Sequence, residues 1–140
     1  MNTTPAAIAD SCLCLAVMRA ARRTARRFDD ALRPMGITSG QFSILVAIAA
    51  SKGASLGEIA DRMGMDRTTL TRNLKPLETE GVIATEADPD DARRRRLVLT
   101  QTGGALLTLA TPHWQAAQKA TEAQLAGPAA GARAILTEME

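Results

Sequence analysis

The chain has 140 residues, enough for one domain, and its two cysteines are too few and too close together for the disulfide framework of a small secreted protein. Apolar residues make up 46% of the chain and aromatic residues only 2%, so we expect a core of aliphatic side chains carried mostly on helices. The net charge of +2 does not by itself indicate nucleic-acid binding, which must instead rest on where the arginines lie.

Membrane and export signals are not evident along the chain. No apolar run reaches the roughly 18 residues that a membrane helix requires. No basic leader followed by an apolar core is present near residue 1. We therefore expect a cytoplasmic protein with no membrane partner.

A first helix is predicted from Pro5 to Leu32, because apolar residues recur along it at spacings of three and four. Pro34 and Gly36 end it. Its apolar stripe consists of Cys14, Met18, Ala21, Ala25, Phe28 and Leu32. Arginines occupy its other sides.

Two capping boxes mark the next two helices. Thr38 with Gln41 begins a second helix, which Gly53 ends, and Ser55 with Glu58 begins a third. The inward face of the second helix is predicted to hold Phe42, Leu45, Val46 and Ala49. The inward face of the third is predicted to hold Leu56, Ile59, Ala60 and Met63.

A fourth helix follows a turn at Gly64 and Met65, and Asp66 is its predicted N-cap. An apolar edge formed by Leu70, Leu74 and Leu77 is expected to pack on the third helix. The polar side chains away from that edge are then free to read bases in a major groove. They are Thr68, Thr69, Arg72 and Lys75. The alternative is an ordinary amphipathic helix with a solvated face.

Two strands, 82–86 and 95–99, are predicted around an aspartate-rich turn at 88–91. Four consecutive arginines follow this turn, and Asp91 is expected to help position the wing. Arg93 or Arg94 is expected to enter a narrow minor groove, where the negative potential is enhanced. Arg95 and Arg96 are expected to contact phosphates or brace the sheet. A solvated charge run is the alternative.

Thr100 is the predicted cap of a fifth helix that runs to about Leu125 and that Pro112 kinks. Leu106, Leu109, Ala110 and Ala117 supply part of its apolar side. Gly127 and Pro128 separate it from a short last helix, which holds Ile135, Leu136 and Met139.

The segment from Arg67 to Arg72, followed by Asp91-x-Arg93 and then Leu99-Thr100, resembles the MarR family of winged-helix transcriptional regulators. The resemblance covers nearly the whole chain. It implies an obligate homodimer joined by its terminal helices, a pseudo-palindromic operator in double-stranded DNA, usually a repressor function, and an effector pocket between the dimer region and the DNA-binding lobe. The last helix here is short, so we expect smaller dimer contacts than is usual in the family.

The expected fold is mostly α: a winged helix-turn-helix with a two-stranded β-wing, flanked by N- and C-terminal dimerisation helices. Residues 1–140 form a single domain, in which 38–100 are the DNA-binding lobe and 5–37 with 101–140 the dimerisation helices. The terminal helices carry apolar stripes that this small lobe is not large enough to cover, so a two-fold dimer is expected. The alternative is a monomer with a helical cap.

Regulation is expected to involve a small effector, such as a phenolic or aromatic acid, that releases the protein from DNA. Its carboxylate would meet arginines near the helix junctions, Arg19 and Arg23 first among a group that includes Arg22 and Arg26, and His113 would line the pocket. For each of these residues a solvated or structural role is the alternative.

Cys12 and Cys14 suggest a second mode of regulation. On a continuous helix they face about 200° from each other, so they neither pair as a disulfide nor bind one metal ion. A buried structural role is one interpretation, and oxidant sensing through an exposed thiolate is the other. Family members that sense organic hydroperoxides use a cysteine in the first helix, but this chain lacks the tyrosines that accompany it.

Catalysis is not expected. The chain has one histidine and no Ser/His/Asp set, no glycine-rich phosphate loop and no metal-spaced cluster, so we predict neither a cofactor nor a metal site. A winged helix that binds protein rather than DNA is the remaining alternative.

Overall fold

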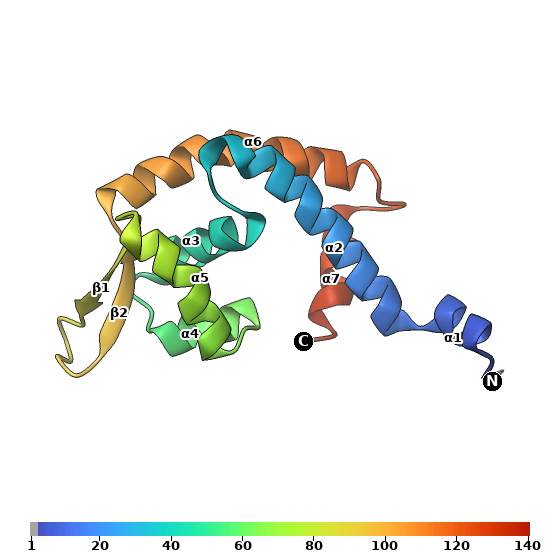
Figure 1. The fold of residues 1–140 in the computed structure, drawn as a ribbon, viewed down its shortest axis with the longest axis horizontal. Coiled ribbons are helices and arrows are strands. Elements are labelled where there is room, and N and C mark those ends of the chain that lie inside the picture. Colours follow the sequence, from blue (N-terminus) through green and yellow to red (C-terminus); the bar gives the residue numbers. More distant parts are fainter. Residues whose placement is uncertain (1–2) are drawn as a thin grey trace.

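The computed structural model describes residues 3–140, which are mostly helical with one two-stranded sheet (Figure 1). The helices are α1 (Pro5–Ser11), α2 (Leu13–Leu32), α3 (Ser39–Ser51), α4 (Leu56–Met63), α5 (Arg67–Thr79), α6 (Gln101–Glu122) and α7 (Ala129–Thr137). A single 3-10 turn at Arg33–Met35 follows α2, and the strands β1 (Ile83–Ala87) and β2 (Arg95–Leu99) precede α6.

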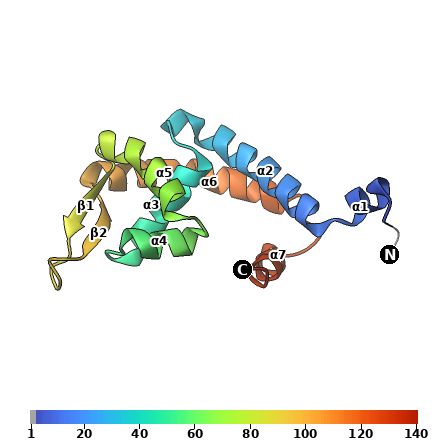
Figure 2. The same ribbon diagram turned by 60° about the horizontal axis from the view of Figure 1, so that its bottom comes forward.

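The elements form a lobe, which contains α3, α4, α5 and the hairpin, and an arm, which contains the long helices α2 and α6. In Figure 1, α3, α4, α5 and the hairpin gather at one end, α6 runs from the hairpin over this group, and α2 contacts α6 and slopes away toward α1. Figure 2 shows that α1 projects from the far end of α2 and that α7 stands apart from both long helices. The predicted fold, a winged helix-turn-helix with long flanking helices, is confirmed.

The predicted helix starts are confirmed by their capping hydrogen bonds. Thr38 and Gln41 form the complete capping box of α3. Ser55 Oγ accepts from the backbone N–H of Glu58 at the start of α4, and Asp66 caps α5. These side chains satisfy N–H groups that the helices leave without an internal partner, which is why each helix begins there.

Helix α3 lies at the centre of the lobe, and its inward face differs from the predicted one. Ile44 and Ile48 are buried beside Phe42 and Leu45, whereas Val46 is 42% exposed and Ala49 is exposed. The helix packs against α4, α5 and β2 and also against α2 and α6. Because it is covered on more than one side, its apolar residues lack the single stripe from which a face is predicted.

The two strands pair antiparallel in the register Ile83↔Leu99 to Ala87↔Arg95. The first strand therefore begins one residue later than predicted. Leu97 N also donates to Ala54 O at 2.9 Å, so the loop between α3 and α4 lies along the free edge of β2. This bond attaches the hairpin to the helix-turn-helix.

The base of the hairpin meets the first turn of α6 at a glycine. Thr100 caps α6 by accepting from Gly103 N at 3.1 Å, and its backbone N–H donates to Val82 O at 3.1 Å. A Cβ at Gly103 would overlap that same carbonyl oxygen and lie 3.0 Å from its carbon. Only a residue without a side chain fits here. Helix α6 ends at Glu122, three residues before the predicted end, and Leu109 is 64% exposed rather than inward.

The single helix predicted from Pro5 to Leu32 is wrong at Cys12. This residue is extended (φ −71°, ψ 107°) and separates α1 from α2. Its Sγ accepts from Leu15 N at 3.4 Å and so caps α2. Residues 10–12 are an aspartate, a serine and a cysteine, all weak helix formers whose short polar side chains bond to nearby backbone. Ser11 shows the effect, because its hydroxyl donates to Ala7 O at 2.6 Å.

Within residues 3–140, no single helix is long and apolar enough to cross a membrane. One pair of helices reaches that length and composition together, Leu13–Met35 with Ser39–Ser51, and it is bent by 78°.

Candidate nucleic-acid interface

Helix α5 presents a polar face to solvent, as predicted for a reading helix. Its apolar edge, Leu70, Leu74 and Leu77, is buried in the lobe. On the other side of the helix the side chains are exposed. They are Thr68, Thr71, Arg72 and Lys75. We call this set the α5 face.

Thr69 differs from the rest of the predicted reading residues. It is half-buried, and its hydroxyl donates to Asp66 Oδ2 at 2.9 Å while its backbone N–H donates to Oδ1 at 2.7 Å. These bonds, with the backbone N–H contributing most, hold the pKa of Asp66 below its ordinary value. Thr69 therefore helps to start the helix, and its role as a base contact remains a prediction.

Arg67, in the first turn of α5, was not among the predicted residues. Its guanidinium lies over Gly57 of α4, with Nη2 only 2.7 Å from the place that a Cβ would occupy. A glycine at this position is what lets the arginine lie across α4. In sequence, the only signal is a glycine in the first turn of one helix and an arginine in the first turn of the next.

The loop between the strands is ordered by its own aspartates. Asp88 N donates to Arg94 O at 2.8 Å, and Arg94 N donates to Asp91 O at 3.0 Å. The carboxylate of Asp91 accepts from Arg93 N at 3.0 Å, and that of Asp88 accepts from Asp90 N at 2.9 Å. Asp91 thus acts on the backbone of the wing, in keeping with its predicted positioning role, rather than on an arginine side chain.

Two of the four consecutive arginines are held within the lobe. Arg94 forms an ion pair with Glu58 of α4 and lies 3.8 Å from Asp88 Oδ2. Arg96 pairs with Glu86 at 3.1 Å, and its stem packs against Gly53. The buried Nε of Arg96 has no hydrogen-bond partner among the described residues. Arg96 therefore braces the sheet, one of the two roles predicted for it.

The other two arginines, Arg93 and Arg95, are exposed and make no ion pair with any residue from 3 to 140. Arg95 and Lys75 line the same groove of about 380 Å³ between α5 and the hairpin. Arg93 at the wing is not paired with an acid among the described residues, and Lys75 and Arg95 make the groove beside the α5 face basic. These two features suit a polyanion that contacts both the wing and the groove.

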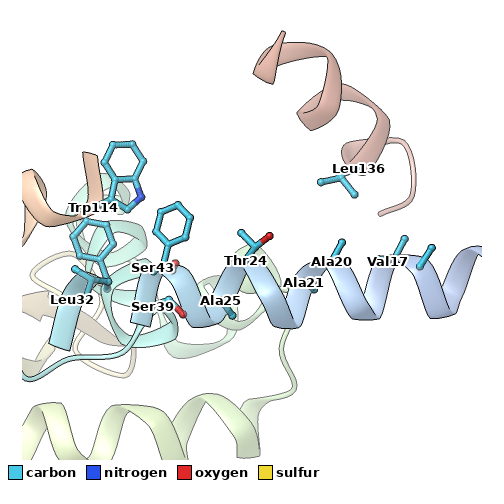
Figure 3. Close-up of a pocket in the computed structure, with 13 residues that line it drawn as sticks. Val17, Ala20, Ala21, Thr24, Ala25, Leu32, Ser39, Ser43, Trp114 and Leu136 are labelled. Carbon is cyan, nitrogen blue, oxygen red and sulfur yellow. The ribbon is translucent and has the colours of Figure 1, made fainter. Parts of the chain in front are cut away.

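The residues predicted for an effector do not line the well-formed hollows found among the described residues. A hollow of about 690 Å³ lies between α2, α3, α6 and α7 and is lined mostly by alanine and other small side chains. Figure 3 shows Trp114 and Leu32 at one end of it and Leu136 of α7 opposite α2. Arg19, Arg23 and His113 do not line it.

We call this space the aromatic hollow, because aromatic side chains contribute to its lining. The chain has two phenylalanines and one tryptophan, and Phe28, Phe42 and Trp114 all line it. The rings of Phe42 and Trp114 are stacked, with centroids 6.2 Å apart and planes at 18°. No charged side chain lines the hollow within the described chain. Sequence reasoning missed these residues, although the scarcity of aromatics is a usable signal.

The cysteines are separated by the break between α1 and α2. Cys12 is half-buried and caps α2, whereas Cys14 is exposed, with its Sγ 3.7 Å from Met18 Sδ. The two cysteines do not share one continuous helix, as was predicted, because Cys12 lies between α1 and α2. Both are free thiols.

A helix-turn-helix with an exposed polar second helix, joined to an arginine-rich hairpin, defines a winged-helix protein of the DNA-binding class. Comparison with known proteins agrees. A model of the MarR family matches residues 35–94. The transcriptional regulator MosR of M. tuberculosis, solved with DNA, is 38% identical, with a TM-score of 0.80 over 91% of this chain and 92% of its own.

Two further proteins are similar over shorter or more divergent stretches. The HTH-type transcriptional regulator TtmR of Methylorubrum extorquens is 35% identical over 97 residues, 69% of this chain. The transcriptional repressor CouR of Rhodococcus jostii, bound to a 23-mer DNA duplex, is 28% identical with a TM-score of 0.78, over 99% of this chain and 96% of its own. The chain spans about half the length of the curated relatives it matches. It belongs to the MarR family of winged-helix regulators.

Proposed function

We propose that the chain is a homodimeric transcriptional regulator that binds a pseudo-palindromic operator in double-stranded DNA and acts as a repressor. The observation that carries the proposal is that the α5 face lies beside a wing with two exposed arginines, Arg93 and Arg95, which form no ion pair with any described residue. In this role the α5 face reads bases in the major groove while Arg93 approaches the minor groove. A binding role of this kind requires neither catalysis nor a cofactor.

Uncovered apolar side chains support the homodimer. Neither α1 nor α7 packs extensively on the rest of the protomer. Large apolar residues are exposed along α1, the start of α2, and the segment from the end of α6 through α7. They are Ile8, Leu13, Leu15, Met18, Leu125, Ile135, Leu136 and Met139. A second copy related by two-fold symmetry would cover these ends and place two reading helices on one duplex.

The aromatic hollow supports a small effector that releases the protein from DNA. It adjoins both the long helices and α3, so a ligand there touches the arm and the lobe at once. Phe28, Phe42 and Trp114 suit an aromatic ring. Ser39 and Ser43, both on α3, supply hydroxyl groups to the same lining. A phenol fits this lining better than a free carboxylate, because no lysine or arginine among the described residues lines the hollow. CouR is itself known with p-coumaroyl-CoA bound.

Thiol sensing is the second candidate, and the position of Cys12 favours it. Its Sγ is the side-chain cap of α2, so oxidation would change the group that starts this helix. Treatment with hydrogen peroxide is expected to weaken DNA binding of the wild type and not of Cys12→Ser, which keeps a capping oxygen. If Cys12→Ser responds to peroxide as the wild type does, Cys12 is not the sensor.

The direct test of the proposed function is duplex binding as a function of salt. A labelled duplex of random sequence should bind with an affinity that falls steeply as salt rises, because released counterions drive much of the association. Selection from a random pool should then enrich a sequence with two inverted half-sites about one helical turn apart. Lack of binding even at low salt would refute the DNA-binding proposal. A thermal-shift screen with phenols and phenolic acids tests the effector separately.

A further inference from the structure

The loop of the wing, residues 88–94, is tied to the helix-turn-helix by a single side-chain pair. Its backbone bonds are internal, and so is the contact between Arg94 and Asp88. Within residues 3–140, the pair between Arg94 and Glu58 is the one polar side-chain contact that leads from this loop to another element. Deeper in the hairpin, Leu97 is anchored by burial and by its bond to Ala54.

The charge of Arg94 is already balanced where it lies. Its guanidinium stands between the carboxylates of Glu58 and Asp88, and the side chain of Asp88 is only 15% exposed. A phosphate that bound Arg94 would have to displace these carboxylates, with no net gain of charge neutralisation. Arg93, its neighbour, carries an exposed side chain with no such partner in the described chain.

We propose that Arg94 is a positioning residue rather than a DNA contact: together with Glu58 it latches the wing to α4 and thereby aims Arg93 at the minor groove. An exposed ion pair contributes little to folding stability, so the effect is on the direction of the wing and not on whether the lobe folds. The inference deepens the proposed function and rests on it for the role of Arg93, but the latch itself exists without DNA.

The first experiment measures the latch without DNA. Trypsin cleaves after arginine, so limited trypsin digestion reports how freely the wing moves. Glu58→Gln keeps every arginine and removes only the charge partner. We expect it to speed cleavage at residues 93–96 several-fold. Asp61→Asn, which removes one charge from an exposed side chain of the same helix, should cleave at the wild-type rate. Equal rates for Glu58→Gln and Asp61→Asn would overturn the proposal.

The second experiment separates positioning from contact by the salt dependence of binding to a random-sequence duplex. Each cation that neutralises a phosphate adds about 0.9 to the slope of log affinity against log salt. Arg93→Ala removes one such cation from each protomer of the dimer and should therefore make the slope shallower by about two, whereas Arg94→Ala should weaken binding and leave the slope near that of the wild type. A loss of slope in Arg94→Ala as large as in Arg93→Ala would show direct contact and overturn the proposal.

The two experiments fail separately. If no variant and no wild-type protein binds a duplex, the proposed function fails while the digestion still tests the latch. If the wild type binds but digestion shows no difference between Glu58→Gln and Asp61→Asn, the latch fails and the proposed function stands.

Discussion

Two adjacent glycines in α6 are expected to respond to the same substitution with opposite signs. A methyl group at Gly103 would overlap the carbonyl oxygen of Val82, which also accepts from the backbone N–H and hydroxyl of Thr100, each at 3.1 Å. At Gly104 a Cβ meets nothing within 4 Å. The two positions therefore share a helix and differ in the room beside them.

The magnitudes follow from this geometry. Moving the hairpin away from α6 costs about 1–3 kcal/mol by analogy with overpacked cores. Weakening the hydrogen bonds of Thr100 adds about 1 kcal/mol. The helical preference of alanine over glycine returns about 1 kcal/mol. We expect Gly103→Ala to lower the free energy of unfolding by about 1–3 kcal/mol, and Gly104→Ala to raise it by up to about 1 kcal/mol.

Urea unfolding followed by circular dichroism measures both variants. Protein concentration must be the same throughout, since association adds to apparent stability. If the free energies of unfolding of the two variants differ by less than about 0.5 kcal/mol, the reasoning from steric overlap is refuted, because it requires a gap several times larger.

Three other outcomes are expected. Arg72→Ala should cost about 1–3 kcal/mol of operator binding and relax base preference at one position in a selection experiment; unchanged preference would exclude Arg72 from base reading. Ile135→Asp should halve the mass measured by light scattering, while Val46→Asp, at an exposed residue of α3 in the DNA-binding lobe, leaves it unchanged. Because its pKa is lowered, Asp66 stabilises the folded state at pH values above the ordinary aspartate pKa of 3.8, and this contribution is lost as pH falls through the folded pKa. Asp66→Asn keeps a cap but no charge, so its unfolding free energy should depend less on pH in acid, and an identical pH profile would contradict the assignment.

The starts of the helices were predictable because they depend on local chemistry. A threonine, serine or aspartate that caps a helix acts on an N–H two or three residues away, and this spacing is visible in sequence at Thr38, Ser55, Asp66 and Thr100. The buried edge of α5 was predictable for a similar reason, since a partly buried helix shows one clear stripe.

The errors arose where a residue's surroundings come from distant parts of the chain. Helix α3 is enclosed by several elements, so periodicity did not distinguish Ile44 from Val46. The break at Cys12 depends on a thiol serving as a helix cap, for which the serine-like pattern gives only a weak signal.

The location of the site was predictable from the sequence, but the role of each of its residues was not. A run of four arginines beside aspartates indicated a wing, but which arginine is paired depends on Glu58, 36 residues away in sequence. The aromatic hollow is a similar case, because Phe28, Phe42 and Trp114 come from three different helices. Only the folded chain brings them together.

The hydrogen bond from Leu97 N to Ala54 O joins the free edge of β2 to the loop that leads into α4. The reading helix and the base of the hairpin are consequently parts of one rigid body, whereas the loop at residues 88–94 depends on the pair between Arg94 and Glu58 for its direction. We therefore expect an inducing signal to change the distance along the duplex between the DNA-binding lobes of the two protomers. Operator binding would then be lost because the two reading helices no longer match the helical repeat of DNA, while each lobe keeps its own structure.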